Sequence, residues 1–319
     1  MRIIMMGTGP FAVPTFESLI TSEHDVVVLV TRPMPPVRTR GKPPVNPMRD
    51  VAGQHAIEVI APDDVNSEGA RAQLAALRPD LFVVCDYGQI LSPETLAITP
   101  LGGINLHGSL LPKYRGAAPV QWSILKGDTE TGVAVIHMTP QLDSGPCLIT
   151  RSTPIGNDET AEELEPRLSQ LGVKPVHQSI DMLEAWDGTS MLGTIQDRSL
   201  ASRAPRLKKS DGNIDWKQTA PQIRNQIRAL KPWPRSFTQW QRPKGQPVRL
   251  IVDQVSLAAN PSADATPGTI IQIDNAGLHV ATGEGVLLIQ TVQPAGKRIM
   301  DAAAFLRGHP VTVGDLLGS

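Results

Sequence analysis

The chain has 319 residues, of which 40% are hydrophobic. This length is enough to form one domain with a large core, but two domains are the better expectation. The formal net charge of −1 excludes a uniformly basic chain, yet residues 201–319 carry 15 Lys and Arg against 8 Asp and Glu. The two cysteines, Cys85 and Cys147, lack CxxC spacing, which argues against a disulfide framework and a zinc site, so no metal is expected.

No segment of the sequence predicts export or insertion into a membrane. The apolar run at residues 2–6 is too short for a signal peptide, and no apolar stretch reaches the length of about 18 residues that a membrane span requires. We therefore expect a soluble, cytoplasmic protein without a membrane partner.

The first 150 residues alternate short apolar runs, rich in β-branched side chains, with helical patterns. This alternation predicts an α/β domain built on a doubly wound, mostly parallel, Rossmann-like sheet. The predicted strands are residues 2–6, 26–31, 57–60, 81–85, 104–107 and 133–138.

The first predicted strand is followed by GTGPFA at residues 7–12, which matches the GxGxxA pattern of dinucleotide sites. Pro10 removes one backbone N–H from such a phosphate site. Thr31 and Arg32 stand at the end of the second strand, where an acidic residue would hold a ribose. We interpret the segment as a tight turn between strand and helix.

Residues 32–47 contain six prolines and four basic residues. The prolines exclude a helix and the charges exclude burial. The segment is therefore expected to be an exposed, unusually long basic loop.

Residues 104–118, INLHGSLLPKYRGAA, concentrate chemically useful groups after a predicted strand. Side chains alternate along a strand, so Asn105 and His107 should point the same way near its end. Gly108 and Pro112 end the strand in a loop. Ligands of α/β enzymes bind at such strand ends.

A third polar group, Asp143, follows the predicted strand 133–138. We expect this strand to run parallel to its neighbour, which would bring Asp143 to the edge that holds Asn105 and His107. An amide that donates to an oxyanion, an imidazole and a carboxylate suit direct acyl transfer to an amine through a tetrahedral intermediate. Ser109 lacks the GxSxG context of a hydrolase nucleophile. Taken singly, His107 and Asp143 are also explained as caps of a loop and a turn.

The rest of the chain predicts a second domain. Residues 160–186 have the pattern of a closing helix, and residues 189–206 have the composition of a linker. The domains are therefore expected at 1–188 and 207–319. An amphipathic helix at 220–230 and short strands near 237–240, 248–252, 269–273, 278–281 and 286–289 predict a small OB-like β-barrel.

The run at residues 105–119, with Leu142-Asp143-Ser144-Gly145 downstream, resembles the signature of the folate-dependent formyltransferases, in particular the members that act on tRNA. The similarity extends to residues 87–91, 211–216, 231–234 and 294–297, and so to nearly the whole chain. It implies an N-terminal catalytic domain, a C-terminal tRNA-binding domain, and a monomer.

The resemblance also implies the reaction and its residues. The formyl group of 10-formyltetrahydrofolate, the folate cosubstrate, would pass to the α-amino group of methionine on initiator tRNA, for translation initiation. Asn105, His107 and Asp143 would be catalytic. The folate would contact Ser109, Leu110, Leu111, Pro112, Ile90 and Leu91.

The resemblance also implies a role for the basic residues, because cationic side chains bind the phosphates of a tRNA. Each of them could equally be an ordinary solvated surface residue. The candidates are Arg38, Arg40 and Lys42 of the long loop, and Arg203, Arg206, Lys208, Lys209, Arg242, Lys244, Lys297 and Arg298.

Two departures from the family pattern lie near the predicted site: Asp86 replaces a small apolar residue, and Pro146 replaces an acidic one. Two alternatives stay open. A formyltransferase acting on an amino sugar nucleotide would share the catalytic run, but such enzymes generally lack the long basic loop. An RNA-binding protein on a degenerate enzyme scaffold would give no heat when titrated with a folate analogue.

Overall fold

The computed structural model describes residues 1–35, 45–242, 245–258 and 265–318. Its residues group into two compact units. Unit 1 comprises Met1–Val120, Glu130–Ile155 and Glu163–Arg206, and unit 2 comprises Gln121–Thr129, Gly156–Glu162 and Leu207–Ser319. No helix in the described ranges has the length and apolar character needed to cross a membrane.

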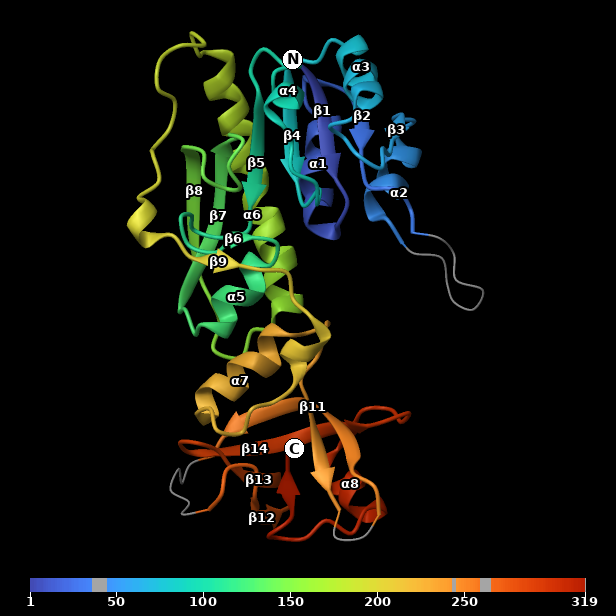
Figure 1. Cartoon of the computed structure of the whole chain (residues 1–319), viewed down its shortest axis with the longest axis vertical. Helices are drawn as coiled ribbons and strands as arrows, with labels where there is room; N and C mark the ends of the chain where they lie inside the picture. Colours follow the sequence, from blue (N-terminus) through green and yellow to red (C-terminus); the bar gives the residue numbers. More distant parts are fainter. Residues whose placement is uncertain (36–44, 243–244, 259–264, 319) are drawn as a thin grey trace. The chain divides into compact units, whose positions relative to one another are not determined.

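Unit 1 is built on a seven-stranded sheet of order β3-β2-β1-β4-β5-β7-β8 (Figure 1). The first five strands are parallel, as predicted, whereas β7 runs antiparallel to β5 and β8 antiparallel to β7. The strands are β1 (Arg2–Gly7), β2 (Asp25–Val30), β3 (Val59–Ile60), β4 (Leu81–Cys85), β5 (Gly103–His107), β7 (Glu130–His137) and β8 (Cys147–Pro154).

The antiparallel direction of β7 corrects the expectation that its carboxyl end lies beside that of β5. His137, at the end of β7, pairs with Ile104 at the start of β5. The partner strand β8 was not predicted, because this edge strand buries only one of its eight side chains and so lacks a long apolar run. Together β7 and β8 form a hairpin whose connection, residues 138–146, carries Asp143.

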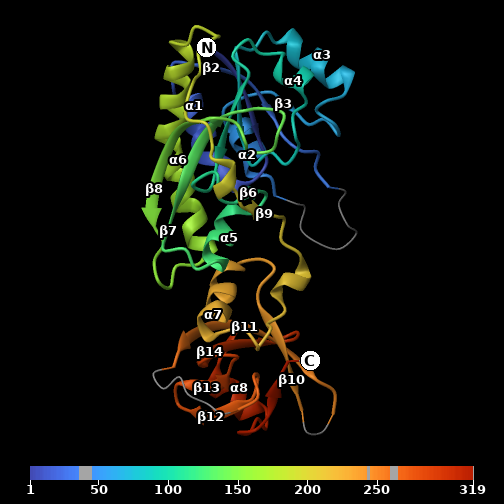
Figure 2. The same ribbon diagram turned by 60° about the vertical axis from the view of Figure 1, so that its left-hand side comes forward.

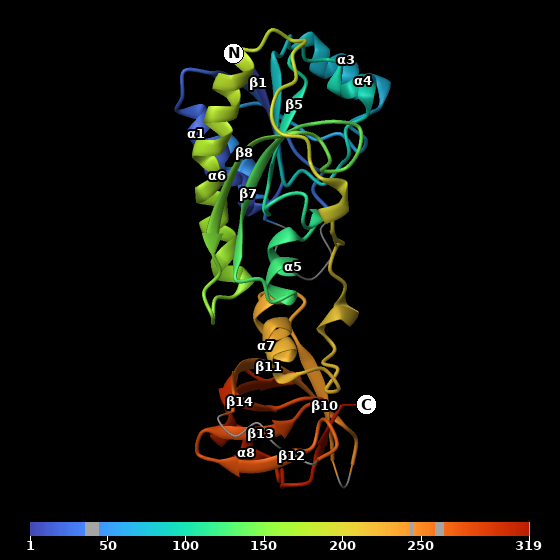
Figure 3. The same ribbon diagram turned by 90° about the vertical axis from the view of Figure 1, so that its left-hand side faces the viewer.

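Helices cover both faces of this sheet, as expected for a doubly wound fold. Figures 2 and 3 show α1 and α6 on one side and α3 and α4 on the other. Ser67 and Ser92 cap α3 and α4 with their hydroxyl oxygens. The helices of unit 1 are α1 (Val13–Ile20), α2 (Pro47–Gln54), α3 (Glu68–Ala76), α4 (Pro93–Leu96) and most of α6 (Ala161–Glu184), with the 3-10 turn η1 (Pro10–Ala12) before α1. Helix α5 (Pro119–Leu125) begins in unit 1, and its residues from Gln121 onward belong to unit 2.

Unit 2 holds a second sheet of order β12-β13-β14-β11-β10-β16, with β15 on β14. A bridge between Thr269 and Leu316 joins its two edges, so the sheet nearly closes and the barrel prediction is confirmed. Its elements are α7 (Ala220–Ala229), β10 (Phe237–Gln241), β11 (Val248–Leu257), β12 (Ile270–Asp274), β13 (Gly277–Ala281), β14 (Val286–Pro294), β15 (Met300–Asp301), α8 (Ala302–Gly308) and β16 (Leu316–Leu317), after the turn η3 (Lys209–Gly212).

The interior of the barrel is apolar and contains two buried tryptophans, Trp216 and Trp240. The indole N–H of Trp216 donates to Thr238, and that of Trp240 donates to Asp315 at 2.9 Å. Each buried polar atom of these rings therefore has a partner. Helix α8, which was not predicted, packs Phe305 edge-on against Trp240.

Candidate active site

The structure brings Asn105, His107 and Asp143 together in unit 1. Asn105 and His107 occupy alternate positions at the end of β5. The amide nitrogen of Asn105 donates to Asp143 Oδ1 at 3.3 Å, and His107 Nδ1 lies 3.8 Å from Asp143 Oδ2. A hydrogen-bond donor, an imidazole and a carboxylate thus face one another within contact distance.

Asp143 reaches this position by a route that the sequence did not suggest. Because β7 is antiparallel to β5, the connection 138–146 must fold back to bring the carboxylate to Asn105. Asp143 adopts a left-handed backbone conformation, with φ of 48°. The backbone N–H of Gly116 donates to Asp143 Oδ2 at 2.8 Å. The carboxylate is therefore held by a side chain of β5 and by a backbone N–H of the loop that follows β5.

The hydrogen bonds of His107 assign its protonation pattern. Its Nε2 lies 2.9 Å from the carbonyl oxygen of Tyr114. A carbonyl only accepts, so Nε2 carries a proton and Nδ1 faces Asp143. His107 is 5% exposed. A proton gained at Nδ1 would thus be directed toward the carboxylate.

The loop after β5 closes on itself. The buried hydroxyl of Ser109 donates to the backbone oxygen of Lys113 at 2.7 Å. Leu111 is also buried, whereas Leu110 and Pro112 are partly exposed. Ser109 could therefore meet a ligand through its backbone but not through its hydroxyl.

The two apolar residues predicted to line the folate site differ in exposure. Ile90 is 61% exposed, whereas Leu91 is 1% exposed and packs into the core formed with β1, β2 and β4. Only Ile90 presents its side chain at the surface.

Asp86, directly after β4, is an acidic residue near the site whose carboxyl has a raised pKa. Its carboxylate packs directly over Gly9, where an added Cβ would collide with Asp86 Oδ2. Although Asp86 is exposed as a residue, loss of water around its carboxyl, together with repulsion by Glu165, outweighs the attraction of Arg206 and raises the pKa of Asp86 to about 6. GTGPFA forms the predicted tight turn, with η1 beginning at Pro10.

A segment expected to be a linker is packed against the site. We call residues 194–204 the strap. Thr194 exchanges two backbone hydrogen bonds with Cys147, at 2.8 Å each. Strand β9 (Arg203–Ala204) pairs with β6 (Arg115–Gly116) in the loop after β5. The sequence carried no periodic pattern that could reveal these long-range pairings.

The candidate tRNA contacts fall into two groups. Arg38, Arg40, Lys42 and Lys244 lie outside the described residues. The others are exposed: Arg203 and Arg206 in unit 1, and Lys208, Lys209, Arg242, Lys297 and Arg298 in unit 2.

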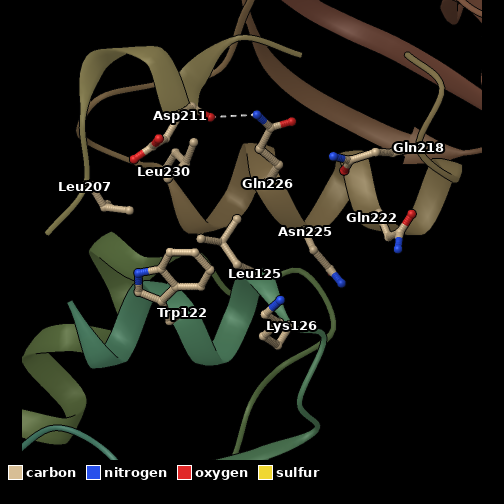
Figure 4. Close-up of a pocket in the computed structure, with 10 residues that line it drawn as sticks. All are labelled: Trp122, Leu125, Lys126, Leu207, Asp211, Gln218, Gln222, Asn225, Gln226 and Leu230. Atoms are coloured by element: carbon tan, nitrogen blue, oxygen red, sulfur yellow. Dashed lines mark hydrogen bonds between the residues drawn. The ribbon is translucent and has the colours of Figure 1, made fainter. Parts of the chain in front are cut away.

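Figure 4 shows a pocket of about 440 Å³ in unit 2. Its wall combines Trp122 with carboxamides, and the amide of Gln226 donates to the backbone oxygen of Asp211. None of its lining residues is a predicted catalytic or folate-binding residue. They are Trp122, Leu125, Lys126, Leu207, Asp211, Gln218, Gln222, Asn225, Gln226 and Leu230.

Comparison with known proteins places both halves of the chain. The formyl transferase family matches residues 1–180, and the formyl transferase C-terminal domain matches residues 206–310. A methionyl-tRNA formyltransferase from Rhodopirellula baltica is 46% identical, covering 99% of this chain and 96% of that protein. One from Trichlorobacter lovleyi is 42% identical, with the same coverages.

Solved structures at lower identity share the fold. The sugar 3N-formyl transferase WlaRD has a TM-score of 0.66 at 18% identity, covering 93% of this chain and 99% of that one. HypX from Aquifex aeolicus, in complex with tetrahydrofolic acid, has a TM-score of 0.59 at 16% identity, covering 96% of this chain and 47% of that one. The matches over both halves, and relatives above 40% identity over nearly the full length, show that the chain belongs to the formyl transferase family, among the methionyl-tRNA formyltransferases.

Proposed function

We propose that Asn105, His107 and Asp143 catalyse the formyl transfer of this family, from 10-formyltetrahydrofolate to the α-amino group of methionyl initiator tRNA. The convergence of the three side chains is the observation that carries the assignment. In the reaction a bond forms between the amine nitrogen and the formyl carbon, and the bond from that carbon to the folate nitrogen breaks. One proton moves from the amine to the departing nitrogen.

Each side chain has a role that follows from its chemistry. The N–H of Asn105 that is not bonded to Asp143 donates to the formyl oxygen as it gains negative charge. His107, once protonated at Nδ1, adds positive charge beside that oxygen. Asp143 stabilises this imidazolium and assists the transfer of the proton from amine to folate nitrogen.

The folate would be held at the strand ends beside β5. Ile90 offers exposed apolar surface to its ring system, and the partly exposed Leu110 and Pro112 offer further apolar contacts. Ser109, Leu111 and Leu91 have buried side chains, so we assign them to shaping the backbone of the site.

The tRNA would be bound by the exposed cations described above, with the protein acting as a monomer in the cytoplasm. The assignment of these cations to tRNA binding rests on the net positive charge of residues 201–319. Residues 189–206 would connect the catalytic domain, 1–188, with the tRNA-binding domain, 207–319.

A direct competition of acceptors tests the function. The purified protein is given 10-formyltetrahydrofolate with either methionyl initiator tRNA or an amino sugar nucleotide, and the formylated product is measured. We expect product with the tRNA only. Formylation of the amino sugar nucleotide alone would contradict the proposal, and binding of tRNA without any product would favour the non-catalytic alternative.

A further inference from the structure

The side chain of Gln196, in the strap, occupies a buried position against the loop that carries Asp143. Gln196 is 7% exposed. Its Nε2 donates to the backbone oxygens of Asp143, at 2.9 Å, and Gly145, at 2.7 Å. Its Oε1 accepts from Arg115 Nε at 3.1 Å and from Nη2 at 2.6 Å. A carboxamide has two N–H donors and two acceptor lone pairs, so this one has no hydrogen-bonding capacity left.

The contacts of Gln196 hold the part of the Asp143 loop that needs support. Asp143 has a left-handed backbone, which a residue with a side chain adopts only where its surroundings impose it. Both N–H groups of Gln196 engage carbonyls of this turn, on Asp143 itself and two residues later. The direction of the Asp143 carboxylate depends on this backbone geometry.

Arg115 connects the Gln196 side chain to the loop after β5, in which Arg115 lies. Its backbone N–H donates to Ser202 of the strap at 2.9 Å, so the arginine is itself anchored. The next residue, Gly116, donates to the carboxylate of Asp143. Gln196 thus holds the backbone of Asp143, and Gly116 holds its carboxylate. The strap and the loop after β5, which supply these two residues, are themselves joined by the pairing of β9 with β6.

We propose that Gln196 is a positioning residue, which keeps the Asp143 carboxylate in register with Asn105 and His107 during formyl transfer. This inference rests on the catalytic role proposed for Asp143. It assigns a part of the active site to the strap, more than 50 residues from Asp143 along the chain.

The test combines substitutions at Gln196 and Asp143. Gln196→Ala should lower kcat by about 10- to 100-fold, the range expected when a reacting group is misplaced, while KM for folate and tRNA changes less than about twofold. Gln196→Glu can still accept from Arg115 but cannot donate to the two carbonyls, so it should not restore kcat. Gln178→Ala is the matched control, because Gln178 also accepts from an arginine, Arg151, on the same unit.

The double variant separates positioning from general structural damage. In the Asp143→Asn background, Gln196→Ala should cause little further loss of kcat, because both changes act through one carboxylate. An equal loss in both backgrounds, an effect on KM alone, or full kcat in Gln196→Ala would overturn the inference.

Two further measurements keep the result interpretable. If Gln196→Ala does not fold, as judged by circular dichroism, Arg115→Lys removes the two-pronged contact with Oε1 and should lower kcat in the same way but less. No effect of Arg115→Lys would then overturn the inference. If Asp143→Asn alone retains full activity, the proposed function of Asp143 fails, whereas loss of activity in Asp143→Asn with full activity in Gln196→Ala rejects only the role of Gln196.

Discussion

The loop after β5 and the strap both shape the active site, but they do so in different ways. The loop continues a single stretch of chemistry that begins in β5, with Asn105 and His107 at the strand end and the Tyr114 carbonyl in the loop. The strap contributes hydrogen bonds to backbone atoms, through Gln196 and β9. A contiguous catalytic motif can be identified from sequence, whereas a distant support is visible only once the chain is folded.

The largest loss of activity is expected from a substitution in the contiguous catalytic motif, at Asn105. Asn105→Ala removes the donor to the developing oxyanion and should lower the formylation rate by about 10²- to 10³-fold. Single-turnover kinetics with methionyl initiator tRNA measures this loss. Unchanged turnover would remove Asn105 from the mechanism, and a loss no greater than that of Gln196→Ala would remove the distinction between chemical and supporting residues.

Two exposed cations, Arg203 in the strap and Arg206 just after it, could also contact substrate directly. If these exposed cations meet tRNA phosphates, the double change to Ala should weaken tRNA binding by about 10-fold at low salt. It should also reduce the dependence of log K on log salt by about 2, one for each cation. Binding measured by filter retention over a salt series checks both effects. An unaltered salt dependence would restrict the strap to a supporting role.

Two serine substitutions, Ser109→Ala in the loop after β5 and Ser202→Ala in the strap, measure how much each segment contributes to stability. Ser109→Ala removes the hydrogen bond that the buried Ser109 hydroxyl donates to the backbone oxygen of Lys113, and should cost about 1–3 kcal/mol of unfolding free energy. Ser202→Ala removes the acceptor for the Tyr114 N–H from an exposed residue and should cost about 0.5–1 kcal/mol. Urea denaturation measures both values. The reverse order would mean that the strap, and not the loop, carries more of the local stability.

A smaller effect is expected from Asp86, which lies on neither segment. Because its pKa is raised from 3.8 to about 6, the folded state keeps a proton that the unfolded state has lost. Ionisation of Asp86 therefore lowers stability as the pH rises from about 4 to about 6. Asp86→Asn should have a higher Tm than the wild-type protein at pH 8, with a smaller difference at pH 5.

The control for Asp86 is Asp80→Asn, since Asp80 accepts from the backbone N–H of Arg2 in the same unit. That change removes a stabilising contact and should lower Tm at pH 8. A difference between Asp86→Asn and wild type that does not depend on pH would contradict the titration account.

The features of the fold and of the site that could be predicted were those that a short stretch of sequence encodes. Apolar runs located β1, β4 and β5 to within a residue or two, and the alternation of side chains placed Asn105 and His107 on one face. The direction of β7 could not be predicted, because a strand has the same periodicity whether it pairs parallel or antiparallel. The expected proximity of Asp143 to Asn105 was right, but the parallel-edge argument for it was wrong.

Other features depend on distant contacts. The strap has few apolar residues, so its composition resembles a flexible linker, although Gln196 is buried. Helix α8 is short and rich in alanine, and it is stabilised by the Asp301 cap and by packing of Phe305 against Trp240. Neither contact has a signature within a short window of sequence.

The most direct test of the account is the single-turnover rate of formyl transfer to methionyl initiator tRNA by the Asp143→Asn variant, measured beside the wild-type protein. Asparagine keeps the size of the side chain and can still accept from Asn105 or Gly116, but it cannot support an imidazolium. The account predicts a rate at least about 100-fold below wild type with folate and tRNA affinities nearly unchanged. A wild-type rate in this variant would contradict it.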